Sequence, residues 1–355
     1  MAGVRSTKAN YGLPRHRNDI VRVLETDFIP MSPATRLPEK EYLSKHGGLE
    51  LQPHQRRILN HAFTPVRIEG SRKMRLPYDT IVYSCPKKSG KTQILAGIFV
   101  AWARTFGGVQ YGMANSREQS RDRAFSRVGM YADHLRRTNL TKYNSMFDTY
   151  ETDRITFKDP YSSIQTVPVA PGSQAGGFQS LTGWDELWSY ERDAALRLFA
   201  EMQPIPTIPD VTLPKHFIHG GKTIASPSLR IITTYAGFHG TSELLWNIYN
   251  NVCKPDLNTE EEGGTPIPGL EDLPVYISDD KRTLCYWDHE SRMPWQTPEF
   301  LARALADPIN QMRPEEYKRL WENRWVSGND AFISMAFIDA AMEQGQARGL
   351  ANMYP

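Results

Sequence analysis

The chain has 355 residues, with 42 Lys and Arg against 40 Asp and Glu and a formal net charge of +2. This length corresponds to about two domains, or to one large domain with appendages. The near balance of charge excludes a simple polycationic nucleic-acid coat. Three widely spaced cysteines exclude a disulfide scaffold and a zinc ribbon. No apolar run suits a membrane span or a signal peptide, so the sequence predicts a soluble cytoplasmic protein.

Residues 1–48 are predicted to form an N-terminal arm more than a domain. Four prolines interrupt this stretch, its first part is basic, and its apolar periodicity is poor. We expect a mostly extended segment with one short helix over residues 18–25. Such an arm could contact DNA phosphates or a neighbouring subunit, and a solvated tail is the equal alternative.

From Leu49 onward, predicted strands and helices alternate, which indicates an α/β fold with a mostly parallel sheet flanked by helices. Ser116 and Gln119 form a capping box for one long helix that reaches about residue 137. In chain order, the pattern predicts a strand over 80–85, a helix over 91–106, strands over 109–114, 154–157, 163–169 and 229–234, and a helical segment over 297–355.

The strongest local signal is residues 85–92, which read Cys-Pro-Lys-Lys-Ser-Gly-Lys-Thr between a predicted strand and a predicted helix. In that setting, backbone N–H groups and a helix N-terminus cradle phosphate oxygens. Lys91 would reach the β- and γ-phosphates of a nucleotide, and the Thr92 hydroxyl would hold Mg²⁺. Cys85 stands where the usual pattern has its first glycine, so a basic turn before a helix is the alternative.

An acidic pair, Asp185 and Glu186, follows about 100 residues later at the end of a β-like run. Asp185 would orient the Mg²⁺ shell, and Glu186 would polarise the attacking water. Adjacent strand residues point to opposite faces, which favours different tasks for the two carboxylates. A solvated helix start explains the pair equally well when it is taken alone.

Two further features support a motor. Gln55 precedes the loop by about 30 residues. Its side-chain amide can both donate a hydrogen bond to an adenine and accept one from it, although a lone Gln is more often a surface residue. Thr233, Thr234 and Gly237 end a β-like run and could sense the γ-phosphate and relay its loss. An ordinary strand followed by a loop is the alternative.

Taken in order, these motifs resemble the ATPase half of tailed-bacteriophage terminase large subunits, the DNA-packaging motors. Residues 86–92 resemble the branch whose loop reads Pro-Arg-Lys-x-Gly-Lys-Ser, with Lys87 in place of the commoner Arg. Gln55, the Asp185–Glu186 pair and residues 233–237 resemble the family's adenine, Walker B and coupling motifs. Residues 322–326 resemble the end of its lid region.

The resemblance implies a P-loop NTPase fold of the RecA/ASCE type with a small helical lid subdomain. It implies ATP and Mg²⁺ as cofactors, with Glu186, Lys91 and Lys87 catalytic and Thr92 and Asp185 at the metal. The nucleotide-binding residues would be Gln55, Pro86, Lys87, Lys88, Ser89, Gly90, Lys91 and Thr92. The chain would divide into an arm (1–48), an ATPase core (49–250), a lid or linker subdomain (251–335) and the start of a further linker (336–355).

The implied partners are double-stranded DNA, a portal protein and a small terminase subunit. The family further implies a homo-oligomeric ring, a pentamer, that assembles on the procapsid in the host cytoplasm without membrane contact. The basic stretches 67–75 and 117–137 are candidate DNA contacts, because phosphate contacts hold DNA without reading its sequence.

The sequence departs from the family in two places. Only 16 residues follow Asp339, so we expect no RNase H-like nuclease domain and no nuclease activity in this chain. The stretch 173–178, where some terminases carry an arginine finger, has no Arg. Candidates elsewhere are Arg117, Arg121, Arg123 and Arg127, each with a solvated helix face as the alternative.

Two rival functions stay open at this point. A superfamily-2-like helicase or translocase would share the adenine, loop and acidic motifs, although the remaining length shows no second RecA-like domain with an arginine-bearing motif. A non-catalytic nucleic-acid or capsid-docking module with a decayed phosphate loop would explain the missing glycine.

Overall fold

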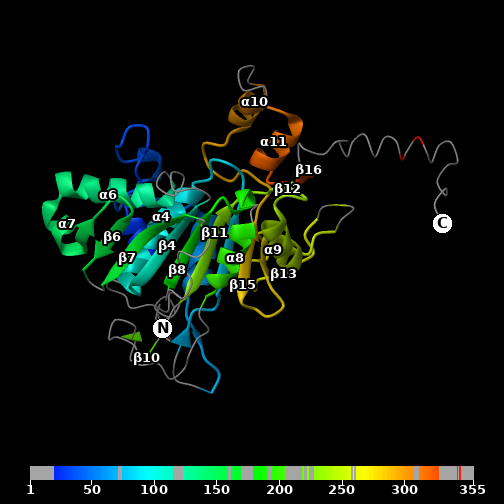
Figure 1. Cartoon of the computed structure of the whole chain (residues 1–355). Coiled ribbons are helices and arrows are strands. Elements are labelled where there is room, and N and C mark those ends of the chain that lie inside the picture. The colour runs from blue at the N-terminus through cyan, green and yellow to red at the C-terminus, as the bar shows by residue number, and fades with distance from the viewer. Residues whose placement is uncertain are drawn as a thin grey trace, which may run out of the picture.

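The computed structural model describes residues 20–70, 74–114, 123–158, 161–168, 179–190, 193–204, 218–219, 222–223, 228–256, 259, 261–306, 312–327, 342 and 344. A twisted sheet runs through the molecule, with helices in front of it and behind it (Figure 1). The ten strands lie in the order β13 (Thr265–Pro266), β14 (Val275–Ile277), β15 (Thr283–Trp287), β3 (Thr80–Ser84), β11 (Leu229–Thr234), β8 (Gln179–Asp185), β4 (Gly108–Ala114), β7 (Ser162–Pro168), β6 (Arg154–Phe157) and β5 (Phe147–Tyr150).

The six strands from β15 to β7 are mutually parallel, and the strands at both edges are antiparallel. Parallel neighbours require crossover connections, which here carry the helices. β11 lies between β3 and β8, so the ends of these three strands meet at one edge of the sheet. The fold is α/β and mostly parallel, as the sequence predicts.

Each face of the sheet has its own layer of helices. On one side lie α2 (Ile20–Thr26), α3 (Pro53–Phe63), α4 (Lys91–Thr105) and α6 (Ala124–Thr138), and on the other lie α8 (Asp193–Glu201) and α9 (Glu243–Cys253). Strand residues alternate between these layers: Ile81 and Tyr83 pack with the first set and Val82 with the second. This alternation is the period of two that a strand buried on both faces must show.

The elements around the phosphate loop follow the prediction closely. β3, α4, β4, β6, β7 and β11 each lie within a residue or two of their expected ranges. β8 is a buried central strand despite its polar residues, because Gly183 leaves room for Phe99; a Cβ there would lie 2.5 Å from the Phe99 ring. The expected capping box at Ser116 and Gln119 lies outside the described residues, among which α6 starts at Ala124.

The N-terminal arm is partly a core element. α2 confirms the predicted short helix, but Ile20, Val23 and Leu24 are fully buried, so a solvated tail is wrong for this stretch. Leu24 and Phe28 pack against α4 at Gly97, where a Cβ would lie 3.1 Å from the Phe28 ring. Residues 1–19 lie outside the described part of the chain.

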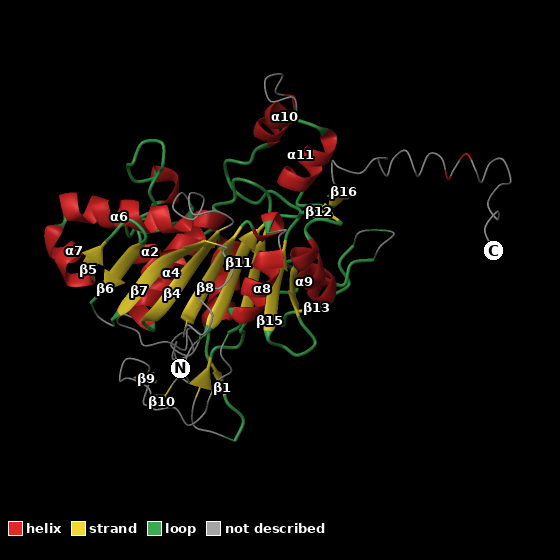
Figure 2. Cartoon of the chain, in the orientation of Figure 1, coloured by secondary structure: helices red, strands yellow, loops and turns green. Residues whose placement is uncertain are grey.

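The segment 251–335, expected as a lid or linker subdomain, divides between the sheet and a small helical cap. Its strands β13, β14 and β15 extend the sheet beyond β3. Its helices α10 (Pro298–Ala306) and α11 (Pro314–Trp321), called the lid helices below, stand above the carboxyl ends of the strands (Figure 2). β16 (Val326–Ser327) then pairs with β12 (Phe238–His239). Within the described residues, no helix has the length and apolarity to cross a membrane.

Shorter elements complete the fold. The 3₁₀ helices η1 (Lys40–Tyr42) and η2 (Leu187–Ser189) lie near the phosphate loop, and α7 (Leu140–Met146) follows α6. The hairpins β1 (Val66–Arg67) with β2 (Met74–Arg75), and β9 (Ile218–His219) with β10 (Lys222–Thr223), lie at the edge opposite the lid helices (Figure 2). Strands β1 and β2, which carry Arg67 and Arg75 of the basic stretch, therefore lie away from the end of the sheet at which the lid helices stand.

Candidate active site

Residues 85–92 form a tight loop between β3 and α4. Lys88 (φ 68°) and Gly90 (φ 78°) adopt left-handed backbone conformations, and a Cβ at Gly90 would lie 2.9 Å from the Tyr42 ring. Lys91 Nζ donates hydrogen bonds to the carbonyl oxygens of Cys85 (2.7 Å) and Pro86 (3.1 Å). The ammonium is thus held over the loop, where a phosphate would replace the carbonyl oxygens as its partner.

A cavity of about 670 Å³ opens above this loop. Its walls are Pro33, Ala34, Glu39, Tyr42, Lys87, Lys88, Ser89, Gly90, Lys91, Thr92, Gln93, Arg127 and Glu186. Three lysines, an arginine and a helix N-terminus here face two carboxylates, which is the composition of an anion site with an acid–base group beside it. The predicted loop residues Lys87 to Thr92 and the predicted base Glu186 all line it.

Two hard oxygen ligands meet beside the cavity. The Thr92 hydroxyl donates to Asp185 Oδ2 (3.1 Å), and the Thr233 hydroxyl donates to Asp185 Oδ1 (2.7 Å). The second contact arises because Thr233 on β11 lies directly beside Asp185 on the adjacent parallel strand β8. Mg²⁺ is held in proteins by one or two carboxylates or hydroxyls and keeps several waters, so this pair fits that ion. Asp185 itself is 2% exposed.

Glu186 directly follows the last residue of β8 and adopts a left-handed backbone conformation (φ 60°, ψ 52°). Its N–H donates to Thr233 O (2.6 Å), and its Oε2 accepts from Trp188 Nε1 (2.8 Å). This turn brings the carboxylate to the cavity beside Asp185 and so replaces the opposite-face arrangement that a continued strand would give. Burial raises the pKa of Glu186 to about 7, against the charge of Lys91, which lowers it. A carboxylate with that pKa suits a general base.

The structure separates the four arginine candidates. Arg117 and Arg121 lie outside the described residues. Arg123 Nη1 donates to the backbone oxygen of Asp185 (2.6 Å). Arg127 lines the cavity, and its Nε and Nη1 are buried without a hydrogen-bond partner among the described residues. Burial lowers the pKa of Arg127, while Glu39 and Asp185 oppose that shift.

Gln55 supports the loop from behind. It is 2% exposed and is absent from the cavity wall. Its Oε1 accepts from the Gln52 N–H (3.0 Å), and its Nε2 donates to Ser89 O (3.3 Å). In this conformation both ends of the amide are occupied within the protein, so the contacts that would read an adenine are already used.

A second groove, of about 900 Å³, continues from the cavity and shares Glu39, Tyr42 and Lys88 with it. Its apolar walls are Leu37, Pro38, Tyr42, Leu43, Trp295 and Phe300. Tyr42 and Trp295 meet edge to face at 5.1 Å, and Trp295 Nε1 donates to Lys88 O (2.9 Å). The sequence analysis did not predict this groove, because its walls come from two segments far apart in the chain, residues 32–43 and residues 295–300.

The predicted coupling residues lie directly behind Thr92 and Asp185. Thr233 and Thr234 are fully buried, and Gly237 has no room for a Cβ, which would lie 2.3 Å from Ser242 Oγ. Next to them, Asn323 Oδ1 accepts from Ser84 Oγ (3.1 Å) and from the Ala236 N–H (2.7 Å). Its Nδ2 donates to Asp288 O (3.0 Å). Asn323 thereby joins the ends of β3, β11 and β15.

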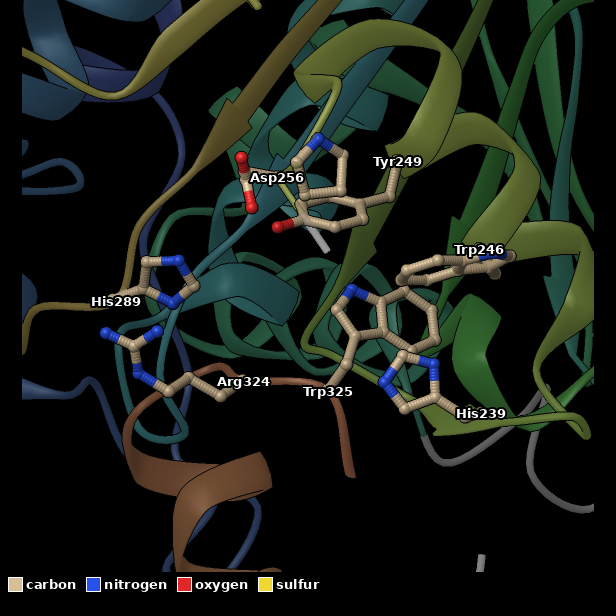
Figure 3. A pocket seen from close by; sticks show the side chains of 8 residues that line it. His239, Trp246, Tyr249, Asp256, His289, Arg324 and Trp325 are labelled. Carbon is tan, nitrogen blue, oxygen red and sulfur yellow. The ribbon is translucent and has the colours of Figure 1, made fainter. Parts of the chain in front are cut away.

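A smaller cavity of about 70 Å³ lies beyond Asn323, separate from the loop (Figure 3). His289 and Arg324 stand on one side of it and Trp246, Trp325 and His239 on the other. His289 Nε2 faces Glu262 Oε1 (2.6 Å), and Nδ1 faces Glu322 O (3.0 Å). Both partners are acceptors, and although burial opposes the shift, the hydrogen bond and charge of Glu262 raise the pKa of His289 above its ordinary value.

A search of solved structures places this geometry among known folds. The chain matches the crystal structure of the HK97 bacteriophage large terminase with a TM-score of 0.50 and 14% identity, over 91% of this chain and 58% of that one. The chain has the fold of a bacteriophage large terminase. It spans under two thirds of the HK97 terminase, at 58% of its length.

The Thermus phage P74-26 large terminase ATPase domain, at 12% identity and a TM-score of 0.40, matches 70% of this chain and 89% of its own. No protein-family model and no curated protein matches the sequence. The terminase fold is therefore shown by the architecture of the chain.

Proposed function

We propose that this chain is the ATP-hydrolysing motor part of a terminase large subunit, which moves double-stranded viral DNA into a procapsid. The observation that carries the proposal is the convergence of Lys91, Thr92 and Glu186 at one cavity, with Asp185 hydrogen-bonded to Thr92. These residues stand at two boundaries of a terminase fold, the start of α4 and the end of β8. A loop that had lost its function would have no reason to retain, beside the lysine, a half-buried carboxylate with a raised pKa.

In this proposal, the triphosphate lies on the loop 86–92, with the amides of α4 and the ammonium groups of Lys87 and Lys91 around its oxygens. Burial lowers the pKa of Lys87, followed by the charge of Lys88, so Lys87 sits where a phosphate charge is favourable. Arg127 lines the same cavity, has two donors without a hydrogen-bond partner among the described residues, and is the favoured arginine of the four candidates.

The nucleobase would lie in the adjoining groove, against Tyr42, Trp295 and Phe300. Aromatic and apolar walls that continue directly from a phosphate site suit a flat base. Gln55 would act as the brace of the loop, and its contact with adenine stays a prediction that requires its amide to leave Ser89 O.

For the chemistry, Glu186 accepts a proton from the attacking water, since a carboxylate with a pKa of about 7 is a stronger base than one with an ordinary pKa. Lys91 and Arg127 neutralise charge that grows on the γ-phosphate oxygens. Thr92 and Asp185 would hold Mg²⁺, which when bound would offset the negative charge of the phosphate oxygens. Thr233 fixes the orientation of Asp185 from the neighbouring strand.

Coupling to DNA would pass through Thr233, Thr234 and Gly237 to the lid helices α10 and α11, all within the same edge of the sheet. The family fold extends the proposal to a portal protein, a small terminase subunit and a pentameric ring in the host cytoplasm. The helicase alternative shares this site, so the choice between the two rests on the substrate and not on the site.

The deciding experiment compares Mg²⁺-dependent ATP hydrolysis by wild type and Glu186→Gln, with double-stranded DNA and partner subunits present. We expect kcat to fall by a factor of about 10² to 10⁴ in the variant, with ATP binding retained. Glu201→Gln, on the exposed end of α8, is the matched control. A wild type without hydrolysis would refute the motor and favour a docking module, and unwinding of a forked duplex would favour a helicase.

A further inference from the structure

We infer that Arg319 is a positioning residue that holds the Glu186 carboxylate in place through the ring of Trp188. The inference rests on the proposed ATPase function and goes beyond it, because it gives one lid residue a defined part in orienting the base. Arg319 lies on α11 and is 4% exposed, an unusual place for a guanidinium.

Aromatic rings surround the Arg319 guanidinium. Its central carbon lies 4.2 Å from the centroid of Trp188, 4.4 Å from that of Phe238 and 5.1 Å from that of Tyr235. Nη2 donates to Glu316 Oε2 (2.9 Å) on the same helix. Within the described residues, Nε and Nη1 have no hydrogen-bond partner. The ring faces therefore supply much of what stabilises this cation, and tryptophan is the side chain whose ring attracts a cation most strongly.

The indole N–H of Trp188 contacts the carboxylate of Glu186, the proposed base. Its Nε1 donates to Glu186 Oε2 (2.8 Å), its backbone N–H donates to Thr234 Oγ1 (3.4 Å), and its carbonyl accepts from Ser242 Oγ (2.8 Å). The backbone is thus fixed, and the direction of the indole N–H depends on what packs against the ring. Arg319 packs against that ring, so its removal frees the indole to turn away from Glu186.

The next residue on α11 contacts the phosphate loop. Leu320 O accepts from the Lys87 N–H (2.6 Å). One turn of a lid helix therefore touches both the loop and, through Trp188, the base. A displacement of α11 changes the two together, and misplacing a reacting group by about 1 Å can cost 10² in rate.

Arg319 does not line the cavity of about 670 Å³. A role as a direct phosphate ligand would require it to leave three aromatic rings, whereas the positioning role uses the contacts as they stand. Simple packing is the remaining alternative, and it predicts no effect on the indole hydrogen bond once the protein is folded.

The test combines spectroscopy with kinetics on the full chain. The indole N–H resonances of the eight tryptophans are recorded by ¹⁵N NMR, and Trp188→Phe assigns the signal of interest. Glu186→Gln shows how far that signal moves when its charged acceptor is lost. The variants are Arg319→Met, Trp188→Phe and their combination, with Lys318→Met, an exposed cation on the same helix, as the matched control.

We expect Arg319→Met to move the Trp188 signal in the direction set by Glu186→Gln and to lower kcat about tenfold or more. The KM for ATP should stay within about twofold, because no ground-state contact is lost. The double variant should be no slower than Trp188→Phe alone, since both changes break one chain of contacts. Lys318→Met should change neither signal nor rate.

An unmoved Trp188 signal in folded Arg319→Met would overturn the inference. Losses in rate that multiply in the double variant, or a raised KM for ATP at constant kcat in Arg319→Met, would overturn it as well. If Arg319→Met fails to fold, Arg319→Lys replaces it, because lysine keeps the charge without the planar face that stacks on the ring. A moved signal in a protein whose wild type does not hydrolyse ATP would reject the proposed function and leave the Arg319–Trp188–Glu186 contact established.

Discussion

The Thr92 hydroxyl donates a hydrogen bond of 3.1 Å to the carboxylate of Asp185, although 93 positions separate the two residues. Parallel strands explain the meeting: β3 leads into the loop before Thr92, β8 ends at Asp185, and both strands end at the same edge. The bond brings together the two side chains that we propose as metal ligands.

We predict that Thr92→Ala raises the Mg²⁺ concentration needed for half-maximal ATP hydrolysis by about tenfold or more, because one of two oxygen ligands is lost. Thr92→Ser keeps the hydroxyl and should behave as wild type. The measurement is a Mg²⁺ titration of the hydrolysis rate at saturating ATP. Equal Mg²⁺ dependence in all three proteins would remove Thr92 from the metal site.

The groove beside the loop leads to a prediction on base recognition. Phe300→Ala should weaken ATP binding several-fold through loss of an apolar contact worth about 1 kcal/mol, and leave the binding of inorganic triphosphate unchanged. Leu305→Ala, also exposed on α10 but outside the groove, is the control. Calorimetric titration of both ligands separates the base from the phosphates. An equal loss for the two ligands would place Phe300 at the phosphates instead.

The Asn323 side chain gives a prediction on stability. Asn323→Leu should lower the free energy of unfolding by about 2–4 kcal/mol, since it leaves Ser84 Oγ, the Ala236 N–H and Asp288 O without their buried partner. Glu322→Gln, the preceding residue, should change it little. Urea unfolding monitored by tryptophan fluorescence measures both. A loss as small as that of the control would mean that the three strand ends hold together without this amide.

His289 gives a prediction on pH. Burial by itself lowers its pKa, but the hydrogen bond and charge of Glu262 outweigh burial and raise it. A histidine whose folded pKa lies above its unfolded value stabilises the fold fully below about pH 6.5 and loses that effect as pH rises through the folded pKa. The difference in unfolding free energy between wild type and His289→Gln should therefore be larger at pH 6 than at pH 9.

Unfolding in denaturant at the two pH values checks this sign. His46→Gln, an exposed residue, is the control and should show no such pH dependence. A difference that grows toward high pH would contradict an imidazolium between Glu262 and the Glu322 carbonyl oxygen.

Local patterns were sufficient to predict the strand and helix on either side of the loop and the position of Asp185 and Glu186 at the end of a strand. They succeed there because β3 and α4 carry strong periodicity and the loop chemistry is contiguous in sequence. The turn that brings Glu186 beside Asp185 could not be predicted, because a left-handed glutamate has no composition signal and is set by the Thr233 carbonyl.

Contacts made across long distances in sequence were the other part that escaped prediction. Three such contacts join segments whose own residues have the composition of ordinary loop or helix surface. They are those of Tyr42 with Gly90, of Trp295 with the Lys88 carbonyl oxygen, and of Arg319 with Trp188. Gln55 shows the converse: its position near the loop was foreseen, but its burial behind Ser89 depends on packing that a motif does not contain.

The packing of α2 on α4 has a consequence for how the protein can be shortened. Of the 15 residues of α4, the structure buries 13, and Leu24 and Phe28 cover it at Gly97. A version of the chain that begins at Leu49, as its proline-rich start would invite, would expose that apolar surface to water. Such a fragment would self-associate through the helix that starts at Lys91, and its aggregation would be mistaken for a defect in nucleotide binding.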